Sequence, residues 1–287
     1  MSDSIKVFSN LSSPLGGQGA FLYILHLADN VLILGQRNSE WTGHGPVLEQ
    51  DIAITNISLD YLGQARNFYQ YAAELYNGFS DDEKQSVDKW LPRLWKDYNR
   101  GLEEDDLAFL RDEHQYLNLL LVEVPKGDWA KTVFRQFLFS CFQYYLFQNL
   151  QKKSSDQQIA AIADKSLKEI SYHLKWSSEW VIRLGDGTDE SHRRMNDAVT
   201  DLWKYTGELF QPALYEESVF QAFGVAIQEI QESWNKKVDD VFAEALLKVP
   251  EQTGNLTGGK AGRHTEHMGY LLAEMQYLQR AYPNSKW

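Results

Sequence analysis

The sequence predicts an all-α protein in which long antiparallel helices form a bundle. No stretch of the 287 residues shows sustained alternation of apolar and polar side chains, which is the pattern of a half-buried strand. Several long segments instead repeat apolar side chains at helical spacing, and Pro stands between these segments and not inside them. Long helices with short connections favour a bundle, here as a single domain over residues 1–287.

The first two helices are predicted from their apolar patterns. Residues 20–37 are apolar almost throughout, as in a helix at the centre of a bundle. Residues 47–76 contain no Pro and one Gly and place apolar side chains near one face, so a long second helix is expected. A capping box then follows, with Ser80 three residues before Glu83, and opens an amphipathic charged stretch to about Arg100 that we expect at the surface.

The rest of the chain continues the helical pattern. The apolar run 117–124 is closed by Pro125 and Gly127. The elements expected after it are a third core helix over 129–150, a fourth over 157–184 that ends at Gly185 and Gly187, a fifth capped by Asp189 or Ser191 and extending to about Phe210, a sixth over 220–249 that Pro250 terminates, a glycine-rich loop over 251–262 and a last helix over 263–281.

Composition excludes several classes of function. The chain has 40 acidic and 28 basic residues, a net charge of -12, so neither nucleic acid nor an anionic membrane is an expected partner. The amino terminus has no basic region followed by an apolar stretch, and no window is expected to span a bilayer, so a cytoplasmic location is expected. Cys141 is the only cysteine and lies among apolar residues, so we expect a buried thiol and neither a disulfide nor a Cys₄ metal site.

Polar residues inside the core helices could mark a metal site. Di-iron bundles take a Glu from each of two helices and Glu-x-x-His from each of the other two. No core helix here contains Glu-x-x-His, and the helix over 129–150 has no carboxylate, so we expect neither an intact metal site nor a catalytic residue. We expect a vestigial metal site or a buried polar network, made of Asp29, Asn56, Asp60, Gln136, Glu169 and His173. Arg66 or Arg135 would supply the counter-charge. Surface placement of several of them is the alternative.

Two motifs precede the last helix. The first motif consists of Gly258, Gly259, Lys260 and Arg263. It could bind a phosphate through backbone N–H groups and cations, or it could be a plain flexible connector. The other contains His264, Glu266 and His267 but lacks the His-Glu-x-x-His order of zinc hydrolases. We expect it to be a first-turn cluster that caps the last helix.

Four blocks of the sequence resemble the C subunits of bacterial phenylacetyl-CoA 1,2-epoxidases. They are GHGPVLEQDIAITNISLDYLGQAR (43–66), RDEHQYLNLLLVE (111–123), EISYHLKWSSEWVIRLGDGT (169–188) and GGKAGRHTEHMGYLLAEMQYLQR (258–280). The blocks span most of the chain in order, whereas the charged segment 78–104 is longer than the family pattern. The resemblance implies a ferritin-like four-helix bundle with additional C-terminal helices.

The resemblance also implies a role in a multicomponent oxygenase. A homologous A subunit would hold a di-iron centre, a B subunit would accompany it, and a reductase with FAD and an iron–sulfur cluster would deliver electrons from NADPH. The complex would epoxidise the ring of phenylacetyl-CoA in phenylacetate catabolism, and this chain would be a structural subunit without a cofactor. Two alternatives remain: a metal-free scaffold with no oxygenase link, or a self-contained di-iron or di-manganese oxidase that uses Asp29, Asp60, Glu169 and His173.

The sequence also suggests which surface meets a partner. Aromatic residues are enriched in the buried centres of interfaces, and several stand beside charges here: Trp176 and Trp180 near Glu169, and Trp203 and Tyr205 beside Lys204. Subunits of the resembled family dock through long helices. We therefore expect the second core helix to pair with the A subunit, with Phe68 and Tyr69 exposed on it.

Overall fold

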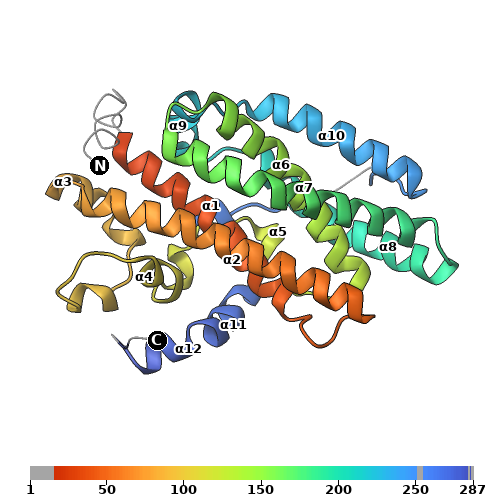
Figure 1. Ribbon diagram of the computed structural model, residues 1–287, viewed down its shortest axis with the longest axis horizontal. Helices are drawn as coiled ribbons and strands as arrows, with labels where there is room; N and C mark the ends of the chain where they lie inside the picture. The colour runs from red at the N-terminus through yellow and green to blue at the C-terminus, as the bar shows by residue number, and fades with distance from the viewer. Residues whose placement is uncertain (1–15, 251–254, 284, 286–287) are drawn as a thin grey trace.

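Four long helices form the body of the molecule. The computed structural model describes residues 16–250, 255–283 and 285, and these contain helices and no strand, as predicted. The long helices are α1 (Gly16–Ser39), α2 (Leu48–Asn77), α6 (Trp129–Lys153) and α7 (Gln157–Gly185). Figure 1 shows α1 and α2 as one hairpin and α6 and α7 as another, packed side by side in the predicted ferritin-like bundle with further helices after it.

The core sits between these hairpins. Residues 19–35 of α1 are buried on every side, and the Cys141 thiol in α6 is fully buried, as expected from their apolar surroundings. The segment Gly17–Ser39 is long and apolar enough to span a membrane, which corrects the expectation that no window has this character. Because 89% of its most apolar window is buried inside the protein, this apolar stretch supplies the core of the bundle.

The charged stretch after α2 is shorter as a helix than the sequence predicted. The capping box of Ser80 and Glu83 is present and opens α3 (Asp81–Val87), but only 3-10 turns follow because Pro92 cannot continue a helix. Val87 and Leu91 are buried, so part of this stretch belongs to the core. The short elements up to α6 are η2 (Asp88–Trp90), η3 (Leu94–Asp97), α4 (Glu104–Phe109), η4 (Glu113–Gln115) and α5 (Leu120–Glu123).

The predicted sixth helix is two helices. Gly224 has a φ of 66° and separates them, and the Lys153 backbone packs where a side chain at Gly224 would lie. The last predicted helix is also divided, and of the loop predicted before it, residues 251–254 lie outside the described residues. The elements after α7 are α8 (Asp189–Leu202), capped by Thr188, then η5 (Trp203–Phe210), α9 (Leu214–Phe223), α10 (Ile227–Glu244), η6 (Gly259–Ala261), α11 (Glu266–Met275) and α12 (Tyr277–Ala281).

Candidate functional site

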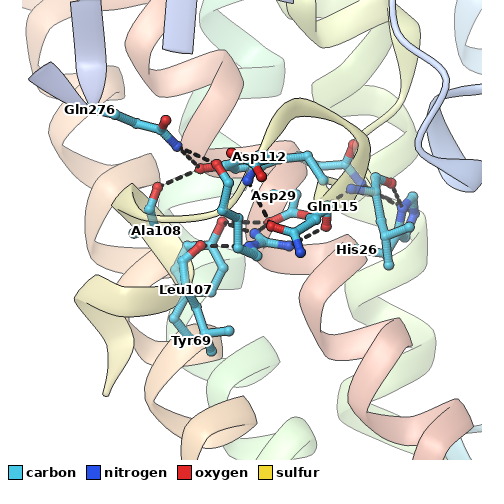
Figure 2. A network of polar contacts seen from close by, with 12 residues as sticks. His26, Asp29, Tyr69, Leu107, Ala108, Asp112, Gln115 and Gln276 are labelled. Atoms are coloured by element: carbon cyan, nitrogen blue, oxygen red, sulfur yellow. Dashed lines mark hydrogen bonds and ion pairs between the residues drawn. The ribbon is translucent and has the colours of Figure 1, made fainter. Parts of the chain in front are cut away.

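Two fully buried charges lie near the middle of α1: Asp29 on that helix and Arg111, which precedes η4. Their side chains form a salt bridge and neither is exposed to solvent. The Asp29 carboxylate also accepts from the Tyr69 hydroxyl at 2.5 Å and from the backbone N–H of Leu117 at 2.7 Å (Figure 2). Burial alone would lower the pKa of Arg111, but the charge of Asp29, the neighbouring Tyr69 and Tyr116 side chains and the hydrogen bond to Asp29 together outweigh burial, so the pKa is raised. This carboxylate is therefore fully paired within the chain.

Side chains from the same part of α1 form hydrogen bonds with the irregular segment after Arg111, at Leu117 and Leu119. His26 Nδ1 donates to the Leu117 carbonyl at 2.7 Å, and the backbone N–H of Leu119 donates to Asn30 Oδ1 at 2.8 Å. His26 Nε2 faces the Asn30 amide N–H group at 3.2 Å and so acts as an acceptor. Burial lowers the pKa of His26, in agreement with a neutral ring. From the other side, Gln276, which lies between α11 and α12, donates to the Arg111 carbonyl at 2.8 Å.

The motif before the last helix is split between two roles. Thr265 caps α11 by accepting from the His267 N–H group, as a capping cluster should. His264 turns inward, with Nδ1 at 2.7 Å from Glu123 Oε2 and Nε2 at 3.0 Å from the Tyr116 carbonyl. Both nitrogens face acceptors, so both carry hydrogens and the ring is a cation. Burial opposes this charge, but the hydrogen bond to Glu123, the charge of Glu123 and the hydrogen bond to the Tyr116 carbonyl together outweigh burial and raise the pKa of His264.

The glycine-rich loop is neither an open phosphate site nor a flexible connector. The backbone N–H groups of Gly258 and Gly259 both donate to Glu208 Oε1 at 2.8 Å. Lys260 is buried and its Nζ lies 2.9 Å from Glu216 Oε2. Arg263 alone of the predicted ligand residues is not buried. A carboxylate of the same chain thus occupies the position that the sequence assigned to a phosphate.

Four of the six predicted network residues line the inside of α2, α6 and α7. The Asp60 carboxylate lies 2.9 Å from His173 Nε2, and Gln64 donates to Glu169 Oε2 at 2.9 Å. Gln136 on α6 donates to the Tyr61 hydroxyl at 2.6 Å. Tyr61 also packs edge-on against His173, with ring centres 4.9 Å apart. Polar side chains therefore fill the centre of the bundle, in separate contacts and not as one ligand set.

The other predicted members lie elsewhere. Asp29 belongs to the Arg111 network, and Asn56 is exposed on α2 because its position faces away from the bundle. Arg66 is also exposed and pairs with Glu104. Arg135 is buried but contacts the Val124 carbonyl and Asn38, not a carboxylate. Burial and the nearby charge of Arg37 lower the pKa of Arg135 to about 9. Neither arginine is the expected counter-charge of the network.

This arrangement does not fit a di-iron centre. Within the part of the chain that the structure describes, no three His, Cys, Asp or Glu side chains gather closely enough to hold a metal ion. Asp60 contacts a histidine, Glu169 contacts a glutamine, and α6 contributes glutamines to the interior. Di-iron sites need four carboxylates around one centre. That the isolated chain carries no metal nevertheless stays a prediction.

The predicted partner residues on α2 need correction. Phe68 is buried against Phe147, and Tyr69 is buried against Asp29, because both face the interior of the bundle. The predicted aromatic surface on α7 is also mostly internal, since the indole N–H groups of Trp176 and Trp180 both donate to Gln50 of α2. The remaining aromatic positions of that prediction, Trp203 and Tyr205, pack against the core. The exposed apolar residues of α2 are Leu48, Ile52 and Leu59.

Sequence reasoning missed Arg111, Glu123 and Glu208, the partners of its own candidate residues. Each lies outside the long helices, where apolar periodicity gives no guide to which side chain points inward. One signal was available: Glu123 is the single charge in the apolar run 117–124, and a charge in such a run needs a buried partner.

Two comparisons with known proteins agree with each other. A family model described as phenylacetic acid catabolic protein matches residues 16–287. The chain is 45% identical over 270 residues to the C subunit of the 1,2-phenylacetyl-CoA epoxidase of Escherichia coli (strain K12). That similarity covers 92% of this chain and 98% of the relative.

Proposed function

Because the chain belongs to the phenylacetic acid catabolic protein family, we propose that it is the C-type subunit of a phenylacetyl-CoA epoxidase and supports catalysis in a partner chain. The observation that carries this proposal is the similarity to an epoxidase C subunit over 98% of that relative, which leaves no large part of it without a counterpart here. Assembly with a catalytic chain in the cytoplasm follows from the proposal.

The interior of the bundle supports a non-catalytic role. Oxygen activation by a ferritin-like bundle needs a carboxylate-rich metal site, and α6 offers Gln136 and Gln143 instead. In the proposed complex, the di-iron centre belongs to an A-type subunit. A B-type subunit accompanies it, and a reductase with FAD and an iron–sulfur cluster supplies electrons from NADPH. This chain would hold the catalytic subunit correctly placed to oxidise the ring of phenylacetyl-CoA.

Metal analysis with co-purification tests this role. The isolated chain should contain no stoichiometric iron, whereas its complex with the A-type subunit should contain iron and should turn over phenylacetyl-CoA with the B-type subunit, the reductase and NADPH. Omitting this chain should abolish turnover without removing iron from the A-type subunit. Two irons per isolated chain would instead favour a self-contained oxidase. If the chain did not co-purify with the A-type subunit, the remaining hypothesis would be a metal-free scaffold unrelated to the oxygenase.

A further inference from the structure

The outer surface of α2 and α7 carries a feature that the chain itself does not explain. Asp60 contacts His173, and Gln64 contacts Glu169, so these two helices run antiparallel. A step of one residue turns a side chain by about 100° around a helix. In antiparallel neighbours, the residues one position before these contacts therefore turn to the same side. The residues in question are Leu59 and Gly63 on α2 and Lys168 and Tyr172 on α7, and all four are exposed.

On α2 this surface is an apolar stripe. Leu48, Ile52 and Leu59 follow one another at helical spacing, with side chains 72%, 51% and 60% exposed. On the neighbouring helix α7, Tyr172 is 47% exposed. Single exposed apolar residues are ordinary, but a row of them along one helix marks a surface that another molecule covers.

Gly63 stands in this stripe without a reason inside the chain. A Cβ atom at Gly63 would meet no atom within 4 Å, and the residue lies in the interior of a regular helix. Glycine destabilises such a position relative to alanine, so nothing within this chain favours it. A missing side chain does allow another backbone to approach closely. Gly63 is therefore where we expect a second helix to come nearest to α2.

The α7 side of the surface carries three lysines although the whole chain has a net charge of -12, and the exposed Asp164 and Glu179 lie on the same side of the helix. Lys165, Lys168 and Lys175 are exposed beside Tyr172. Among the described residues, Lys165 and Lys168 take part in no ion pair, and Lys175 has only Glu179 at 3.9 Å. Unpaired cations beside an apolar stripe suit a partner whose apolar face is bordered by carboxylates.

The size of the surface also limits the partner. Residues 48–63 span about 24 Å of helix, and two neighbouring helices make a strip about 20 Å wide. That is roughly 500 Å², against the approximately 800 Å² per partner of a stable complex. A single bound peptide helix would cover only part of this strip. A folded partner with several helices would cover all of it and extend to neighbouring residues.

We propose that this α2–α7 face docks a helical face of the di-iron partner subunit, whose nearest helix crosses α2 at Gly63 and whose carboxylates lie opposite Lys165 and Lys168. The proposal rests on the function proposed above, because that function supplies the partner. It replaces Phe68 and Tyr69 as the contact residues.

Two variants test the face against the purified A-type subunit. Gly63→Gln should raise the dissociation constant at least tenfold, while the isolated variant melts at the same temperature as the wild type or higher. Ala243→Gln adds the same side chain at an exposed site on α10, at the top of Figure 1, and should leave the dissociation constant unchanged. The double variant Lys165→Glu/Lys168→Glu should weaken binding at least tenfold in low salt and less in high salt. Its control is Lys236→Glu/Lys248→Glu, at exposed positions on α10 and after it.

The outcomes separate the two proposals. If the wild-type chain does not bind the A-type subunit, the proposed function fails. If the wild type binds and Gly63→Gln binds with the same dissociation constant, the docking face is wrong and the function stands. A second copy is the remaining occupant: an isolated wild-type dimer that Gly63→Gln converts to a monomer would overturn the proposed partner.

Discussion

Two buried histidines, His26 and His264, differ in charge because their second ring nitrogens face different groups. In His26 that nitrogen faces an amide N–H group, so the ring stays neutral. In His264 it faces the Tyr116 carbonyl while the first nitrogen faces Glu123, so the ring is a cation. Sequence gives no access to this difference, because the carbonyl and carboxylate partners lie far along the chain from each histidine.

The charge of His264 predicts how stability depends on pH. Its pKa is raised in the folded chain, so its protonation stabilises the fold fully below the ordinary histidine pKa of about 6.5. This contribution is lost as pH rises through the folded pKa. His264→Gln should cost about 3–5 kcal/mol at pH 6, because it breaks a buried ion pair, and less at higher pH. Urea unfolding at pH 6 to 9 measures the difference.

The exposed His114 provides the control for that series. His114→Gln should change the free energy of unfolding little at any pH. A loss in His264→Gln that stays constant over the whole pH range would show that the ring is not charged in the folded chain.

Burial also separates the carboxylates that the sequence grouped together. Asp29 is fully buried against Arg111, whereas the Asp60 side chain is 34% exposed beside His173. Asp29→Ala should therefore cost about 3–5 kcal/mol, since it leaves a buried guanidinium without its partner. Asp60→Ala should cost about 1 kcal/mol, as for a partly solvated pair. Denaturant midpoints of both variants give the comparison, and equal losses would contradict this account.

At the scale of elements, glycines decide where helices end. Gly224 separates α9 from α10 with a left-handed backbone and a Lys153 backbone contact. The apolar pattern runs through this position, so periodicity alone predicted one helix over 220–249. Gly224 was a local signal for this break, because glycine favours the left-handed end of a helix, and packing against the end of α6 fixes the break there. Pro92 was also a local signal, because proline interrupts a helix, but the prediction of a charged stretch to about Arg100 passed over it.

A pair of Gly→Ala variants should have opposite effects on stability. Gly224→Ala would place a side chain against the Lys153 backbone in a left-handed conformation and should cost at least about 1–2 kcal/mol. Gly63→Ala lies in open space within a regular helix and should stabilise the isolated chain by about 0.5–1 kcal/mol. Thermal unfolding of both variants measures this. A gain in stability for Gly224→Ala, or a loss for Gly63→Ala, would contradict this account.

At the scale of the whole molecule, the four-helix bundle was predictable from the sequence. The buried contacts that hold the C-terminal segment against the bundle were not. The helices α1, α2, α6 and α7 follow from apolar spacing that is local in sequence. The buried contacts that hold the C-terminal segment join distant residues: His264 and Glu123 are 141 positions apart, and Leu120 and Glu208 are 88 apart. A single sequence does not show such pairings. For the same reason, Asp29 was predicted as buried while its partner Arg111 was missed.

Because Cys141 is buried, the native chain should not react with thiol-labelling reagents. The Cys141 sulfur is fully buried, and burial raises the pKa of the thiol, so almost no reactive thiolate meets a maleimide dye in the folded state. A cysteine introduced at an exposed position would then be the single site that accepts a fluorophore. Placed at Ala243, for example, a donor dye would report the approach of an acceptor-labelled partner by energy transfer, with no native cysteine to remove first.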